Sequence, residues 1–166
     1  MTKLLLAVFF ALICVTVAPA QIKSVYTKLD EKHCRSLKPD KKNGEFERLK
    51  CNGVGGYWLR VISGGDDSVA DLITPSGKEF SADYHFAGHR VVSGTSEWRV
   101  KKGRPIGLII RYSVQEPDGF KSYLVVSKIS RTGSCIADAI APGKTQNADA
   151  RKVADQPGPC NSTPGN

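Results

Sequence analysis

The residues best suited to metal or acid–base chemistry lie in the segment ADYHFAGHR, residues 82–90. It holds two of the three histidines, His85 and His89, together with Asp83. Imidazole and carboxylate groups bind zinc, and on a helix His85 and His89 would face the same way. However, Gly88 lies between them, the flanking residues are typical of a strand followed by a loop, and the glutamate of an H-E-x-x-H motif is missing. We therefore expect a polar loop without a metal. Asp83, His85 and His89 are the ligands that a metal-dependent hydrolase would have to use.

The usual signatures of catalytic and cofactor sites are missing as well. No G-x-S-x-G nucleophile elbow is present. The segment GVGG at 53–56 is not followed by the lysine and hydroxyl residue of a phosphate-binding loop, so we expect it to provide tight backbone geometry. Asp66, Asp67 and Asp71 lack the regular ligand spacing of a calcium loop. We therefore expect a protein that is not an enzyme and has no cofactor.

The chain is basic, with 24 Lys and Arg residues against 16 Asp and Glu and a net charge of +8. The excess is large in residues 97–131, which contain eight basic and three acidic side chains. A basic patch would attract anionic partners, whereas Glu97, Arg99 and Arg111 could instead form an ion-pair network, or the charges could be spread over a solvated surface. The candidate ligand-binding residues are Trp98, Arg99, Lys101, Arg111, Lys121 and Tyr123.

Alternation of apolar and polar residues predicts β-strands through most of the chain. Residues 57–62 and 68–74 flank the connection SGGDD, and residues 105–114 and 120–129 flank QEPDG. Glycine permits positive backbone dihedrals, and a Pro-Asp-Gly sequence favours a tight turn. Each pair of segments is therefore predicted to form a β-hairpin.

Two of these strands have a clear inside–outside pattern. In residues 96–101, Trp98 and Val100 alternate with charged residues, which predicts one face in the core and one in water. In residues 105–114, Ile109 and Arg111 lie on the face opposite to five apolar or aromatic residues. These five are Ile106, Leu108, Ile110, Tyr112 and Val114.

Helix is predicted in two segments. Residues 145–156 carry a narrow apolar stripe and are followed by Pro157, which ends a helix. Residues 26–34 could form a short first helix with Leu29 and Cys34 turned inward. Together the elements predict a mainly β fold, an antiparallel β-sandwich or small barrel of six to eight strands with a C-terminal helix.

The first twenty residues have the features of a secretory signal peptide. Lys3 precedes an apolar run, and Ala-Pro-Ala at 18–20 matches an A-x-A cleavage site. We expect residues 1–20 to be removed and residues 21–156 to form one disulfide-stapled, β-rich domain, followed by an irregular tail at 157–166. The apolar run is short for a membrane span, so we expect no integral membrane segment in the mature chain.

Four cysteines remain after residue 20: Cys34, Cys51, Cys135 and Cys160. An even number in an exported chain predicts two disulfides, for which three pairings are possible. We favour Cys34–Cys51 and Cys135–Cys160, because each would close a short local loop. The second bond would tether the C-terminal tail. A zinc site built from four cysteines would need C-x-x-C spacing, which is absent.

The segments YTKLDEKHC, CNGVGGY, SEWRVKKGRPIGLIIRY, LVVSKI and GSCIADAI occur in this order. In this pattern, C-x-G-x-G-G-Y followed by E-W-R and G-R-P, the chain resembles a group of small exported hypothetical proteins of alphaproteobacteria. The similarity spans roughly residues 25 to 155, and it implies a Gram-negative periplasmic or secreted protein. No function or site residue is known for that group. In architecture alone the chain is also similar to periplasmic lysozyme inhibitors, although two basic partners would repel each other.

These features predict a non-enzymatic exported binding module. Its partner would be an anionic envelope polymer or lipid, an anionic host component, or an acidic protein. Nucleic acid is not expected in this compartment. The alternative is a protein-partner module, such as an inhibitor of an enzyme that attacks the cell envelope.

Overall fold

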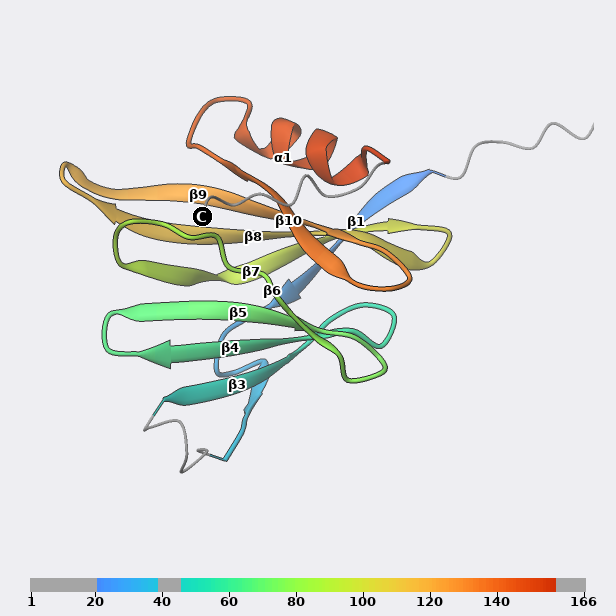
Figure 1. The fold of residues 1–166 in the computed structure, drawn as a ribbon, viewed down its shortest axis with the longest axis horizontal. Helices are drawn as coiled ribbons and strands as arrows, with labels where there is room; N and C mark the ends of the chain where they lie inside the picture. Colours follow the sequence, from blue (N-terminus) through green and yellow to red (C-terminus); the bar gives the residue numbers. More distant parts are fainter. Residues whose placement is uncertain (1–20, 39–45, 158–166) are drawn as a thin grey trace, which may run out of the picture.

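The computed structural model describes residues 21–38 and 46–157 (Figure 1). They form two five-stranded antiparallel sheets that face each other, with a helix on the outer side of one of them. Sheet A has the order β1 (Ile22–Lys28), β7 (Arg90–Lys101), β8 (Arg104–Glu116), β9 (Gly119–Ile129) and β10 (Ser134–Ile140). Sheet B has the order β2 (Cys34–Ser36), β3 (Glu47–Asn52), β4 (Trp58–Gly64), β5 (Asp67–Ile73) and β6 (Glu79–Ser81). The helix α1 is Gln146–Asp155.

The predicted mainly β fold, with antiparallel sheets in a sandwich-like arrangement and a C-terminal helix, is confirmed. The described residues form ten strands, more than the six to eight expected. Two of them, β2 and β6, have only three residues, too few to show an alternating pattern. None of the described helices is long and apolar enough to cross a membrane. The predicted signal peptide at 1–20 lies outside the described residues.

The short helix predicted at residues 26–34 is wrong. The chain runs as strand β1 up to Lys28, turns, and enters β2 at Cys34. Strand β1 pairs along its whole length with β7, from Ile22 opposite Lys101 to Lys28 opposite Thr95. Backbone pairing with a distant strand therefore overrides the weak local preference for helix.

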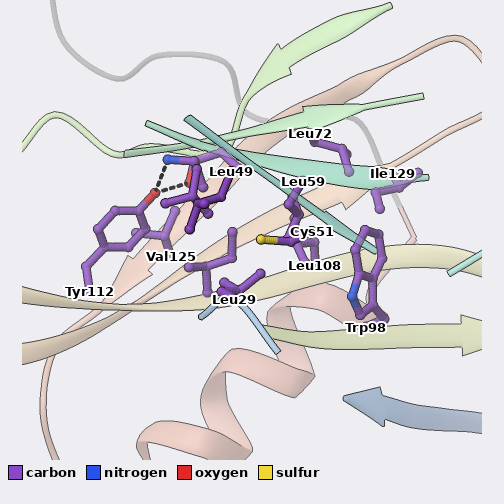
Figure 2. Packing of buried hydrophobic residues seen from close by; sticks show 14 of the residues in the cluster. Leu29, Leu49, Cys51, Leu59, Leu72, Trp98, Leu108, Tyr112, Val125 and Ile129 are labelled. Atoms are coloured by element: carbon purple, nitrogen blue, oxygen red, sulfur yellow. Dashed lines mark hydrogen bonds between the residues drawn. The ribbon is translucent and has the colours of Figure 1, made fainter. Parts of the chain in front are cut away.

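The core lies between the two sheets, and the predicted alternation in β8 is confirmed. Leu108, Ile110 and Tyr112 point into the core, whereas Ile109 belongs to a second cluster on the helix side. Figure 2 shows the buried Tyr112 hydroxyl, which donates a hydrogen bond to the Ala82 carbonyl oxygen and accepts one from the backbone N–H of Ala70. Burial raises the pKa of Tyr112, so the hydroxyl stays neutral and satisfied in the core.

Ile106 departs from the predicted pattern of β8. The pairing of β7 with β8 shifts between Arg99 and Val100, which lie opposite Gly107 and Pro105. The extra residue, Ile106, is half-buried and is not part of the core between the sheets. A β-bulge of this kind turns a side chain out of the regular alternation.

Hairpin connectivity determines which turns share an end of the molecule. Both predicted hairpins are confirmed, β4–β5 at Gly64–Asp67 and β8–β9 at Glu116–Gly119. Because successive antiparallel strands reverse direction, the β7–β8 and β9–β10 turns lie together at one end of the sandwich. The β4–β5 and β8–β9 turns lie at the opposite end (Figure 1).

One predicted disulfide is confirmed. Cys34 and Cys51 are bonded and occupy paired positions of β2 and β3. The bond closes a loop with a sequence separation of 17 residues, for which chain entropy predicts a stabilisation of about 3 kcal/mol. Cys135 is also disulfide-bonded. Its predicted partner, Cys160, and the end of the predicted tail lie outside the described residues.

Helix α1 packs on the outer face of sheet A. Ala150 and Ala154 are buried against Ile109, Leu124 and Val126. This confirms the helix predicted near the C-terminus and its apolar stripe. Thr145 stands at the N-cap without a side-chain hydrogen bond. The second small core fixes the helix across β8 and β9.

The charged face of residues 96–101 was predicted to lie in water, and for Glu97 and Arg99 that prediction is wrong. The two side chains lie under α1 and are only 9 % and 8 % exposed. Arg99 donates two hydrogen bonds to Asp155, at 2.8 and 2.6 Å, and one to Glu97 at 3.3 Å. Arg151 donates to Glu97 at 2.8 Å. The ion-pair network that was the alternative reading of Glu97 and Arg99 is therefore present, and it ties the helix to β7.

This network predicts an acid-sensitive contribution to stability. Burial alone would raise the pKa of Glu97, but hydrogen bonds from Arg151 and Ser24 and the charges of Arg151 and Arg99 lower it overall. A lowered pKa in the folded state means that the contribution is present above the ordinary glutamate value of 4.5 and is lost as the pH falls through the lowered value. At neutral pH, Glu97→Gln should reduce the free energy of unfolding by about 1–3 kcal/mol.

Urea unfolding of both proteins across the acid range tests this prediction. The difference between the wild type and Glu97→Gln should shrink as the pH falls below about 4.5. Glu31→Gln is the matched control, because Glu31 is exposed in the β1–β2 turn. A difference that stays constant with pH would contradict the assignment of the titration to Glu97.

Candidate anion-binding surface

The three candidate metal ligands are not brought together. Asp83 accepts two hydrogen bonds from the Arg90 guanidinium, at 2.8 and 2.7 Å. His89 Nδ1 lies 3.2 Å from Asp67 Oδ1, and His85 is exposed. Within residues 21–38 and 46–157, no group of three or more His, Cys, Asp or Glu side chains could hold a metal ion. The segment forms a polar loop, as its sequence predicted.

Three of the six predicted ligand-binding residues serve the interior or the helix. Trp98 was a candidate ligand-binding residue, but it is fully buried and its Nε1 donates to Thr27 Oγ1 at 2.9 Å. Arg99 is bound to Asp155, as described above. Arg111 donates to Ser122 at 2.6 Å and to Gln146 and Asn147 at 3.2 Å. The arginines predicted on adjacent strands therefore hold the start and the end of α1.

Two further predicted residues, Lys121 and Tyr123, lie in β9 beside the β8–β9 turn. Lys121 Nζ is 2.8 Å from a Glu116 carboxylate oxygen and 3.0 Å from one of Asp118. Tyr123 donates a hydrogen bond to Glu116. The Glu116 and Asp118 carboxylates raise the pKa of Lys121. These contacts neutralise Lys121 locally, and they separate it from the other basic residues of its segment.

Five other basic residues do come together, and we call them the cationic end. They lie on the β7–β8 turn and at the β9–β10 turn, which share one end of the sandwich (Figure 1). They are Lys101, Lys102, Arg104, Lys128 and Arg131. All except the half-buried Lys128 are exposed, and none of the five forms an ion pair within the described part of the chain. Of the six predicted ligand-binding residues, only Lys101 belongs to this group.

Two adjoining hollows lie between these side chains. The first, of about 540 Å³, is lined by Lys101 and Lys128 and by the hydroxyl residues Ser130, Thr132 and Ser134. The C-terminal end of α1 closes it on one side and contributes Asp155, whose carboxylate is paired with Arg99. The hollow therefore offers ammonium donors, whereas the Ser130 and Ser134 hydroxyls donate to the carbonyl oxygens of Gly133 and Lys128.

The second hollow, of about 550 Å³, is lined by Arg104, Arg131 and Tyr57. It shares Ile106, Ile129 and Ser130 with the first hollow. The bulge at Ile106 thus places an aliphatic side chain between the two. Guanidinium and ammonium groups that surround a concave, partly apolar surface are suited to bind an anion that also has an apolar part.

The GVGG segment has a structural role at this hollow. Gly55 and Gly56 have φ values of +64° and +83°, which side chains other than glycine rarely adopt. This backbone turns the chain sharply, and Gly53 N–H donates to the Tyr57 carbonyl oxygen at 3.1 Å. The turn presents Gly55 and Tyr57 at the wall of the second hollow. The prediction that these glycines provide tight backbone geometry is confirmed.

Lys102 occupies the tip of the β7–β8 turn in an unfavourable conformation. Lys102 and Gly103 have φ values of +51° and +75°, so this two-residue hairpin turn has positive φ at both positions, as in type I′. Asn-Gly is the preferred sequence for such a turn, and a lysine there is strained. A charged residue is therefore held at the tip of the cationic end against its backbone preference.

The opposite end of the sandwich carries acidic residues, and we call it the acidic end. These residues lie on the β4–β5 and β8–β9 turns and are Asp66, Asp67, Glu116 and Asp118. A hollow of about 440 Å³ between the two turns is lined by Asp67, His89, Val91 and Phe120. Phe120 is 67 % exposed and Val91 is 42 % exposed. In the described part of the chain, the two ends of the sandwich therefore carry opposite charges.

The strain at Lys102 gives a testable expectation. Lys102→Asn should raise the free energy of unfolding by about 0.5–1 kcal/mol, because asparagine tolerates positive φ. Lys102→Gln is the matched control, since it removes the same charge but keeps the strained backbone. Urea unfolding should show that the asparagine variant is more stable than the glutamine variant. Equal stabilities would mean that charge repulsion, not backbone strain, is what is relieved.

Comparison with protein-family models, with curated proteins and with solved structures finds no match. The likeness to small exported alphaproteobacterial proteins therefore stays a prediction. The function of this chain has to be inferred from the geometry of its two ends.

Proposed function

We propose that this protein is a non-enzymatic binding module that holds an anionic ligand at its cationic end. The observation that supports this proposal is the convergence of Lys101, Lys128, Arg104 and Arg131 around two hollows, with Lys102 at the tip of the adjoining turn, and without a carboxylate partner among the described residues. Like charges in close proximity repel each other and destabilise the folded chain. An anion bound between them would relieve this repulsion.

The size of the hollows and the reach of the charges agree with such a role. Pockets for small ligands usually measure about 300–1,000 Å³, and both hollows fall in this range. The Debye length at physiological salt is about 8 Å, so charges on two neighbouring turns reinforce one another. A ligand at this end therefore experiences the sum of several cations.

The disulfides support a location in an oxidising compartment. Cys34–Cys51 and the bond at Cys135 indicate an oxidising environment. With the predicted signal peptide, we propose a periplasmic or secreted protein of a Gram-negative bacterium. Its ligand would be an anionic envelope polymer or lipid, or an anionic host component.

Charge reversal tests the proposal. Lys101→Glu with Arg104→Glu should weaken binding to dextran sulfate more than tenfold, since each change removes an attraction and adds a repulsion. The control Lys32→Glu with Lys144→Glu has the same net charge, and both of its sites are exposed and outside the cationic end. Binding can be measured by calorimetry at several salt concentrations, with neutral dextran as the blank.

The two variants separate three outcomes. Loss of affinity in the first variant alone supports the cationic end as the binding site. Equal losses in both variants would mean that only net charge matters, and unchanged binding in both would refute the proposal.

A second candidate function is suggested by the acidic end. Phe120 and Val91 are exposed apolar side chains beside a hollow, as in an anchor for a protein partner. An inhibitor of an envelope-targeting enzyme would use such a surface, and its acidic rim fits a basic enzyme.

Phe120→Ser tests this second function. The exposed position should tolerate the change, with stability altered by less than about 0.5 kcal/mol. If the function is correct, the wild type captures one protein stoichiometrically from an envelope or host extract, and Phe120→Ser does not. The variant Lys101→Glu with Arg104→Glu should still capture it. No stoichiometric partner, or capture unaffected by Phe120→Ser, would contradict the second function.

A further inference from the structure

We infer that the protein docks end-on to an anionic lipid bilayer, with the cationic end against the headgroups and the acidic end pointing away. This inference rests on the proposed function and specifies its ligand as a membrane surface. Three features support it: the position of the free cations, the charge at the far end, and the lining of the hollows.

The five cations of the cationic end lie at or beside the tips of two turns. On sheet B, Arg35 and Lys50 are paired neighbours on the face away from the core, and the next residue in that row, Arg60, is bound to Asp71 and Glu79. A flexible polyanion would be expected to follow a basic groove across several strands. In sheet A that path is closed, because α1 covers the outer face and Arg99 and Arg111 are bound to Asp155 and Asn147. A planar surface can instead contact the β7–β8 and β9–β10 turns together, since both project from the same end (Figure 1).

The acidic end determines the orientation. Strand β8 runs from Arg104 to Glu116, 13 residues, which at about 3.3 Å per residue separates the two ends by about 40 Å. This is about five Debye lengths at physiological salt, so the far carboxylates do not weaken attraction at the cationic end. The reversed orientation would place Asp66, Asp67, Glu116 and Asp118 against the anionic surface, with Lys121 offsetting only one of these four charges, and would be repelled.

The lining of the hollows suits a phospholipid headgroup. Lys101 and Lys128 border the first hollow, and their ammonium groups can donate hydrogen bonds to phosphate oxygens. Ile106 lies between the two hollows and offers an aliphatic contact for the glycerol and upper acyl region. Phosphatidylglycerol therefore complements the site in charge, and its apolar part also has a surface to contact.

Vesicle binding tests the inference. The probe is a vesicle of equal amounts of phosphatidylglycerol and phosphatidylcholine, with pure phosphatidylcholine as the blank. The protein is purified from the exported fraction with its disulfides intact, and its mass is checked for an N-terminus at Gln21. Each basic side chain near an anionic membrane contributes about fivefold in affinity, so Lys101→Gln with Arg104→Gln should lower binding about thirtyfold. The control Lys32→Gln with Lys144→Gln should leave binding within about twofold.

Hydrogen exchange on the vesicles reports the orientation. Amides in residues 101–104 and 129–134 should exchange more slowly when the protein is bound. Amides in residues 64–67 and 116–119 should exchange as in the free protein, because the acidic end faces away. Protection at both ends, or at the acidic end alone, would overturn end-on docking even if the vesicles bind.

The dextran sulfate experiment separates the inference from the proposed function. Binding to dextran sulfate through Lys101 and Arg104 without binding to the anionic vesicles would overturn the bilayer as the ligand and leave the proposed function standing. Failure to bind either probe would overturn both. Vesicle binding that both variants reduce equally would also overturn the inference, because docking would then not depend on the cationic end.

Discussion

The contact between helix α1 and sheet A determines which basic residues of this protein are free. Arg99 and Arg111 lie on the outer face of the sheet, where they could have formed a broad cationic surface together with Lys101 and Lys128. The helix instead covers this face, and its residues Asp155, Gln146 and Asn147 accept hydrogen bonds from the two arginines. Of the basic residues in segment 97–131, those that bind neither the helix nor a carboxylate in the described part of the chain lie beyond the C-terminal end of the helix contact, at the β7–β8 and β9–β10 turns.

The buried charges fix the position of α1 on sheet A more than they add to the free energy of its contact. Desolvation of Arg99 and Glu97 offsets much of their Coulombic attraction, so the apolar packing of Ala150 and Ala154 supplies the more certain stabilisation. The ion pairs determine where the helix lies, because a helix shifted along the sheet would leave two buried charges unpaired. That penalty fixes the position of α1, and with it the wall that its C-terminal end forms at the first hollow.

Much of the fold could be predicted from the sequence, because local patterns carry it. The hairpins at SGGDD and QEPDG, the alternation in β8, the C-terminal helix and the Cys34–Cys51 bond all follow from residues close to one another in the chain. The errors arose where distant segments decide. The pattern of residues 96–101 shows that Glu97 and Arg99 share a face, but not that the distant helix at Gln146–Asp155 covers it. In the same way, pairing with β7 draws residues 22–28 into a strand.

The candidate site could be predicted only in part for the same reason. Lys101 lies in a basic segment, which is a local signal for anion binding, whereas the alternation of Trp98 with Glu97 and Arg99 places Trp98 on the core side, where it cannot reach a ligand. The turn Lys101–Arg104, with three basic residues around a glycine, was a local signal for the cationic end. The proximity of this turn to Arg131, at the same end of the sheet, depends on hairpin connectivity. That can be derived only once β7, β8 and β9 are known to be consecutive antiparallel neighbours.

The cationic end is locally unfavourable, and its place in the fold explains how the molecule tolerates it. Neighbouring like charges repel, and Lys102 adds backbone strain at the tip of its turn. Both costs lie at the end of the sheet, away from the core of Leu59, Leu108 and Tyr112, so they do not disturb its packing. For the same reason, a bound anion can relieve the repulsion without any rearrangement of the core. Under the proposed function, an anion bound at this end would add to the stability of the folded state by relieving the repulsion, while the backbone strain at Lys102 would be unchanged.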